Sequence, residues 1–132
     1  MLYLNQVLEK VCRKLLKFDR KIRYVALLGS DGRIVAGGMR RGIPPLEPNS
    51  EDLRLAVHIS GMEQELGTWD RYYGKTLYHI VRREFVSVLI TRCGKFIFLM
   101  SAEPEFPVSS FIDVRDLVLE KADVIEKARL GI

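Results

Sequence analysis

Three apolar runs in the second half of the chain dominate its hydrophobic pattern. They read TLYHIVR, FVSVLIT and FIFLM, and short polar breaks separate them. Because β-branched and aromatic residues fill these runs, they predict three consecutive antiparallel strands that form the larger part of one sheet. The expected strands cover residues 76–82, 85–91 and 96–100.

The first of these strands differs from the other two in polarity. Its side chains alternate, so that Leu77, His79 and Val81 share one face, and polar residues occur on both faces. The later strands are apolar on both faces, which is typical of strands that are central or covered on both sides. We therefore expect the first strand at an edge of the sheet.

A hairpin is predicted earlier in the chain. Two apolar runs, 22–28 and 34–39, flank the tetrapeptide GSDG. Asp-Gly between apolar runs is a strong hairpin signal, because glycine accepts the positive φ that the turn requires. Gly37 and Gly38, near the end of the second run, indicate a bulge or a place where another backbone approaches closely.

Three amphipathic helices complete the pattern. Apolar residues at helical spacing predict helices over residues 4–18, 50–66 and 109–129. Ser50 is expected to cap the second helix, and Ser109 or Ser110 the third. Gly67 and Gly131 are the expected helix stops.

Two connectors have unusual compositions. Residues 40–49 (RRGIPPLEPN) contain three prolines and are expected to form a loop. Residues 68–74 (TWDRYYG) form a short connector that holds three aromatic side chains, those of Trp69, Tyr72 and Tyr73. These aromatics either plug one end of the core or form a contact surface, since aromatic residues are enriched in binding hot spots.

Together the elements predict an α+β fold of the α/β sandwich type. The expected order is α-β-β-α-β-β-β-α, with a five-stranded antiparallel sheet and helices on both faces. The middle helix would cross one face, and the first and last helices would cover the other. No repeat or linker interrupts the pattern, so residues 1–132 are expected to form a single domain.

This arrangement resembles the roadblock/LC7 superfamily and its longin-like relatives. The residues that carry the resemblance are the hairpin YVALLGSDGRIVAGG at 24–38, the helix after it, the three-strand run that ends at Met100, and the terminal helix. Roadblock-like domains serve as platforms that dimerise and bind small GTPases, motor subunits or scaffold partners. The resemblance therefore implies a non-enzymatic interaction module, with regulation of a small GTPase as one role.

The resemblance also implies a homodimer. The two sheets would join along the edge strand over 77–82, and the middle helices would pack together. The strand lacks proline, so its backbone can donate to a partner strand. The middle helix carries more apolar residues than one buried face needs, although Leu55 and Ile59 could instead lie under neighbouring loops. The expected contact residues are Leu55, Ile59, Met62, Trp69, Tyr72, Tyr73, Leu77, His79 and Val81.

The remaining composition adds little chemistry. A net charge of +4 is too small to indicate a nucleic acid or a membrane surface as partner. The two histidines, His58 and His79, and the two cysteines, Cys12 and Cys93, lack metal-ligand spacing. The sequence thus predicts no catalytic site, no cofactor and no metal. It contains no run of ~18 apolar residues and no signal-peptide pattern, so we expect no membrane span and a cytoplasmic location.

Two other functions stay open at this point. PAS-like and profilin-like sensor domains share strand-rich sheets flanked by helices, and such a sensor would hold a small ligand in a cavity lined by Phe96, Phe98 and Tyr78. A nucleic-acid-binding protein would use a basic patch beside the aromatic residues. Its arginines would be Arg40, Arg41, Arg82, Arg83 and Arg92, although nearby acidic residues dilute their charge.

Overall fold

The computed structural model describes residues 2–48 and 51–131. Its helices and strands follow the predicted order, with one added helical turn and the last helix in two segments. The elements are α1 (Leu2–Leu16), β1 (Ile22–Leu28), β2 (Ile34–Met39), α2 (Asp52–Gly67), α3 (Asp70–Tyr73), β3 (His79–Arg82), β4 (Ser87–Cys93), β5 (Phe96–Ala102), α4 (Val108–Glu120) and α5 (Ala122–Leu130).

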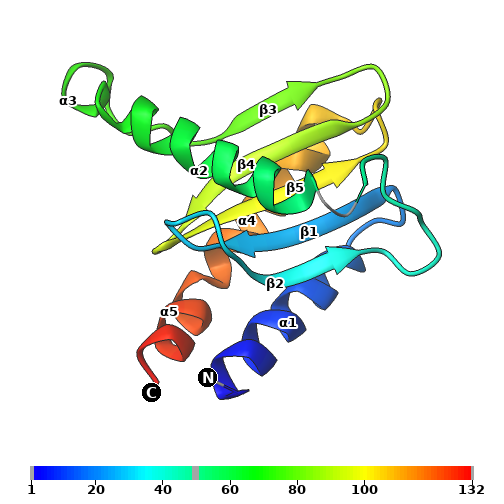
Figure 1. Ribbon diagram of the computed structural model, residues 1–132, viewed down its shortest axis with the longest axis horizontal. Helices are drawn as coiled ribbons and strands as arrows, with labels where there is room; N and C mark the ends of the chain where they lie inside the picture. Colours follow the sequence, from blue (N-terminus) through cyan, green and yellow to red (C-terminus); the bar gives the residue numbers. More distant parts are fainter. Residues whose placement is uncertain (1, 49–50, 132) are drawn as a thin grey trace.

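The strands form one five-stranded sheet in the order β2-β1-β5-β4-β3. All neighbouring strands are antiparallel, and β5 lies at the centre, where its Met100 is level with Val25 of β1 and Leu89 of β4. The predicted five-stranded antiparallel sheet is confirmed. So is the expected edge position of β3, and β2 forms the opposite edge (Figure 1).

Helices cover both faces of the sheet, as predicted. In Figure 1, α2 crosses the near face, whereas α1, α4 and α5 lie against the far face. Alternate side chains of β1 pack against the helices on the two faces of the sheet. Val25 and Leu27 are buried with α1, α4 and α5, and Ala26 and Leu28 are buried with α2. Because the central strands bury both faces, they need no polar face.

The hairpin contains the close backbone approach that its glycines indicate. Gly37 has φ +107°, and a Cβ atom there would lie only 2.1 Å from the carbonyl oxygen of Val25 on the neighbouring strand. Only glycine fits this position without moving β1 away from β2. Gly38 has open space around it, so a residue with a Cβ atom would fit at position 38 but not at position 37.

Two strand boundaries differ from the prediction. β3 begins at His79 rather than at residue 76, because the hydroxyl of Thr91 donates to the carbonyl of Leu77 (3.0 Å) where a ladder bond would otherwise form. β4 begins at Ser87 rather than at Phe85. A tight turn closed by the Arg83 N–H and the Val86 carbonyl (3.0 Å) precedes it.

The C-terminal helix also differs in its start and its continuity. Pro107, in an extended conformation, is the N-cap residue, so the predicted caps Ser109 and Ser110 lie inside α4. Its carbonyl accepts the N–H of Ser110, and proline suits a position whose own N–H would have no partner in the helix. Lys121, with ψ near zero, separates α4 from α5. Gly131 ends α5 with φ 78°, as predicted, and the predicted cap Ser50 lies outside the described residues.

The two cysteines are buried, free thiols. Burial raises the pKa of the Cys12 thiol from 9.0 to about 12 and that of the Cys93 thiol from 9.0 to about 11. Both thiols therefore stay protonated near neutral pH, and a buried, protonated thiol is a poor nucleophile.

Candidate interaction surface

The outer edge of β3 presents free backbone groups. In an antiparallel pair, residues alternate between bonding to the neighbouring strand and pointing away from it. The bond from the Arg83 N–H to the Val86 carbonyl fixes the phase of this alternation. It follows that His79 and Val81 bond to β4, and that the N–H and C=O groups of Ile80 and Arg82 point outward from the sheet.

The opposite edge, on β2, is partly covered. The Arg40 N–H donates to the Arg23 carbonyl (2.7 Å), and the same alternation then turns the N–H of Gly37 outward. That N–H donates to the carboxylate of Glu9 on α1 (3.1 Å). A side chain from α1 thus occupies a position that an added strand would need. Of the two edges, β3 is therefore the less hindered for a partner strand.

Side chains on both faces hold the short strand β3 in place. On the α2 side, His79 Nε2 lies 2.7 Å from Oε1 of Glu63, a helix residue whose side chain is only 5% exposed. On the other side, the guanidinium of Arg82 donates to the carbonyls of Pro104 (2.5 Å) and Phe106 (2.8 Å). The hydrogen bonds of Arg82 therefore anchor the strand, although it forms the edge of the sheet.

One side of α2, next to the hairpin turn, exposes apolar and small residues. Leu53 and Val57 are more than half exposed. Gly61 is exposed, and a Cβ built on it meets no atom within 4 Å. Because Leu53, Val57 and Gly61 follow each other at intervals of four residues, they lie along one side of the helix. A second helix could approach closely at Gly61.

The hairpin turn packs against the side of α2 that carries Val57, Ser60 and Gln64. The Ser60 hydroxyl donates to the Ser30 carbonyl (2.5 Å), and Gln64 donates to the same oxygen (3.0 Å). A Cβ on Gly32 would lie 2.8 Å from the Cα of Val57, so helix and turn are in close contact. Of the two neighbouring small residues on the helix, Ser60 packs inward and Gly61 remains on the surface.

The predicted contact residues divide into three groups by exposure. Those exposed on the surface are Leu55, Trp69, Tyr72, Tyr73, Leu77 and Val81. Met62 and His79 are half-buried, against the sheet and against Glu63. Ile59 is 4% exposed and packs on the sheet, so its expected place on a contact surface is wrong.

Three exposed residues were missed by the sequence-based site prediction. Leu53, Val57 and Phe85 are each at least half exposed. The four-residue spacing of Leu53 and Val57 indicated an apolar stripe along the helix. A second apolar stripe on the same helix contains Ala56 and Ile59, and the spacing alone does not tell which of the two is buried. For Phe85 no signal existed, because an aromatic residue at the start of an apolar run indicates a strand.

Trp69, Tyr72 and Tyr73, which we call the aromatic turn, lie on the surface. The expected irregular connector is a helical turn, α3, which Gly74 ends with φ 80°. The rings of Trp69 and Tyr73 stack with centroids 6.2 Å apart, and the Arg71 guanidinium lies 4.8 Å from the Tyr72 centroid. All three aromatic side chains are at least half exposed, so they do not plug the core.

An apolar groove of about 520 Å³ lies beside α2, on the same face of the sheet. It is bounded by α2, the proline-rich loop and the turn between β3 and β4, with Tyr24 and Leu99 on the sheet side. Burial raises the pKa of Tyr24 to about 12, so its hydroxyl stays protonated. Residues that line the groove include Leu46, Leu55, Phe85 and Val88.

The cavity expected for a ligand sensor does not form. Phe96 and Phe98 are buried in the core under α1, α4 and α5. Tyr78 lies outside that core, with the Arg115 guanidinium 5.3 Å from its ring centroid. The three side chains therefore do not line one cavity.

The arginines of the expected basic patch are spread over different contacts. Arg40 donates to backbone carbonyls from the end of α1 to the start of β1, and Arg82 to those of the loop before α4. Arg92 lies 3.9 Å from the Glu63 carboxylate. They do not converge on a nucleic-acid surface. Within residues 2–48 and 51–131 no three metal-ligating side chains cluster, and no helix there is long and apolar enough to span a membrane.

Known structures share this fold at low sequence identity. MglB in a tetrameric arrangement superposes with a TM-score of 0.79, covering 95% of this chain and 92% of that chain at 14% identity. A roadblock/LC7 domain from Streptomyces avermitilis superposes with a TM-score of 0.69, covering 89% and 95% at 13% identity. Profilin II from Acanthamoeba castellanii gives a TM-score of 0.58, covering 91% and 98% at 14% identity.

These superpositions confirm the resemblance drawn from the sequence, and the chain has the roadblock/LC7 fold. No curated protein matches the chain in sequence. Residues 4–124 match the family of unknown function DUF6659, and the chain belongs to this family.

Proposed function

We propose that the protein is a homodimeric interaction module of the roadblock type, with no catalytic role of its own. The open edge of β3 is the observation that carries this proposal. Ile80 and Arg82 turn their backbone groups outward, and Arg82 anchors the strand to the loop before α4. Antiparallel pairing of two such edges would extend the sheet across both copies.

Two further features support self-association. On α2, the side of the helix that carries the exposed Leu55 is the one turned toward the β3–β4 turn, and both border the apolar groove. A structural neighbour, MglB, adopts a tetrameric arrangement. In the proposed dimer the two α2 helices lie on the same face of the joined sheet and contact each other beside its two-fold axis.

The proposal predicts that Ile80→Pro separates the dimer into monomers. Proline removes the outward N–H of Ile80 without breaking a bond to β4, because the β3–β4 ladder uses His79 and Val81. Proline is tolerated at such an edge position, so the fold should persist. Sedimentation of the wild-type protein at micromolar concentration should give twice the mass of one chain, and the variant should give the mass of a single chain.

Ile80→Ala is the matched control for this experiment. The Ile80 side chain packs partly against the core, and alanine removes that packing while it keeps the N–H. We expect Ile80→Ala to lose some stability and to remain a dimer. A wild-type protein that stays monomeric, or an Ile80→Pro variant that stays dimeric, would contradict pairing through β3.

As the partner of this dimer we propose a small GTPase, following the role of roadblock-like platforms. Purified small GTPases of the host, loaded with GDP or with a GTP analogue, should bind the immobilised wild-type protein in one nucleotide state more tightly than in the other. The monomeric Ile80→Pro variant should bind at least about tenfold more weakly, which corresponds to about 1.4 kcal/mol. Failure of every host GTPase to bind would remove this part of the proposal and leave the dimer unaffected.

A further inference from the structure

Among the residues that the structure describes, none covers the aromatic turn in a way that would explain its composition. The Tyr73 side chain is 82% exposed, and Trp69 and Tyr72 are also largely open to solvent. Their rings are nevertheless ordered by mutual stacking and by Arg71. A rigid, exposed group of Trp, Tyr and Arg has the composition of an interface hot spot.

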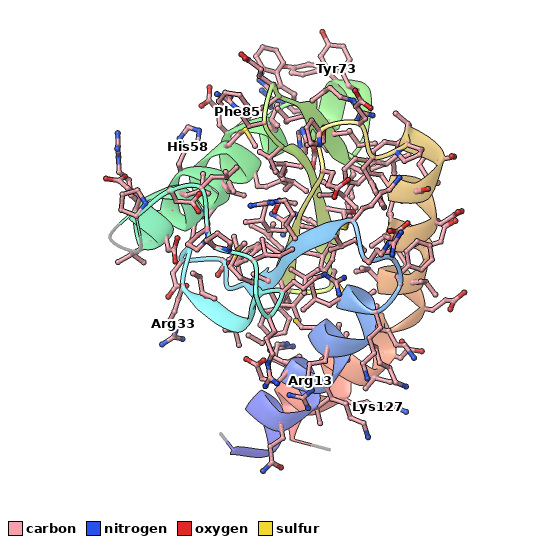
Figure 2. The ribbon with its side chains drawn as sticks, turned by 90° about the vertical axis from the view of Figure 1, so that its right-hand side faces the viewer. Arg13, Arg33, His58, Tyr73, Phe85 and Lys127 are labelled. Carbon is pink, nitrogen blue, oxygen red and sulfur yellow. The ribbon has the colours of Figure 1, made fainter. Side chains whose placement is uncertain are left out.

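A second exposed aromatic lies at the other end of β3. Phe85 is 71% exposed on the tight turn of residues 83–86. In Figure 1 the aromatic turn on α3 and this β3–β4 turn lie at opposite ends of the molecule. Figure 2, which looks along the long axis of Figure 1, shows Tyr73 and Phe85 both on the β3 side. They share an edge of the molecule but cannot meet within one protomer.

Symmetry brings the two features together in a dimer. When two β3 strands pair about a two-fold axis they run antiparallel, so the start of each lies beside the end of the other. Only residues 74–78 separate α3 from the start of β3, and the β3–β4 turn directly follows its end. The aromatic turn of one copy is therefore on the same side as the β3–β4 turn of its partner, twice in each dimer.

We infer that the aromatic turn docks against the β3–β4 turn of a second copy of this chain. This inference rests on the proposed dimer through β3 and adds a contact at each end of the paired strands. Its apolar part joins Trp69 and Tyr73 to Phe85 of the other copy, and aromatic pairs of this kind gain stability beyond the area they bury. Arg71 and Glu84 carry opposite charges at the two sides of the contact.

Disulfide trapping tests this contact. The double variant Tyr73→Cys/Phe85→Cys should form a covalent dimer under mild oxidation, because each introduced thiol faces its counterpart on the other copy. Either single variant alone should stay non-covalent, since its two thiols lie at opposite ends of the dimer. Mixing the two single variants should restore the covalent dimer. The native thiols do not interfere, because Cys12 and Cys93 are buried and protonated.

The outcomes separate this inference from the proposal on which it rests. A double variant that sediments as a dimer but forms no covalent product overturns docking of the aromatic turn and leaves pairing through β3 intact. A monomeric wild-type protein overturns the dimer, and the docking contact with it. Efficient trapping by Tyr73→Cys alone would show that two aromatic turns meet each other, which also contradicts the inference.

A double-mutant cycle supplies an energetic readout. Tyr73→Ala and Phe85→Ala should each raise the dimer dissociation constant on the order of tenfold, because every dimer contains the contact twice. The combined variant should be little worse than either single variant, since both remove the same contact. Fully additive effects would show that Tyr73 and Phe85 act independently, contrary to the inference. Both residues are exposed, so neither change should affect folding.

Discussion

Gly37→Ala is expected to lower the free energy of unfolding by about 3–5 kcal/mol, the range of the most damaging point mutations. The added Cβ would lie 2.1 Å from the Val25 carbonyl oxygen and 2.6 Å from the Ala26 Cα. Both are backbone atoms of a central strand, so no side-chain rotation relieves the clash. The backbone at φ +107° is also strained for any residue with a Cβ. Urea denaturation monitored by circular dichroism measures the loss.

Gly38→Ala is the matched control, one residue along the same strand. A Cβ on Gly38 meets no atom within 4 Å, and the residue is not in the positive-φ region. Its unfolding free energy should stay within about 1 kcal/mol of the wild type. Equal losses for the two variants would show that β2 tolerates displacement from β1, contrary to the tight approach at Gly37.

Arg40→Ala is expected to lower the free energy of unfolding by about 2–4 kcal/mol, because hydrogen bonds to charged groups are worth more than neutral ones. The Arg40 guanidinium donates to the carbonyls of Ile22 (2.7 Å) and Asp19 (2.8 Å), and also to that of Leu16. One side chain thus donates hydrogen bonds both to the end of α1 and to the segment that connects it to β1. Its removal leaves several carbonyls without a donor.

Two variants separate this effect from a loss of charge. Arg41→Ala removes the neighbouring, exposed arginine and should change the unfolding free energy by less than about 0.5 kcal/mol. Arg40→Lys keeps the charge but lacks the planar fork that reaches several oxygens at once, so it should fall between wild type and Arg40→Ala. A lysine variant as stable as the wild type would show that charge alone suffices.

The sequence predicted some strands more accurately than others for a physical reason. β1 and β2 were placed correctly because each is an apolar run that ends at an Asp-Gly turn or a glycine pair. The boundaries of β3 and β4 depend on contacts remote in sequence. The Thr91 hydroxyl replaces a ladder bond at Leu77, and the turn at residues 83–86 removes Phe85 from β4. Local hydrophobicity carries no information about either contact.

The candidate surface was predictable only in outline. The element order was enough to place β3 at an edge, but it could not reveal that Glu9 covers the other edge at Gly37. On α2, apolar residues surround the helix, and periodicity alone did not separate Ile59, which packs on the sheet, from Val57, which is exposed. That distinction depends on how the helix is rotated above the sheet, which distant residues such as Ser30 help to set.

The contact between Glu9 and Gly37 bears on how large an assembly this chain can build. A sheet with two open edges can add copies at both ends without limit, which is the route to fibres. Here a carboxylate from α1 already satisfies a β2 amide that an incoming strand would need. In the proposed dimer, strand addition is favoured at β3 over β2, so that the joined pair presents only its two hindered β2 edges to further copies. A single glutamate on the first helix thereby favours a closed pair over an open-ended filament.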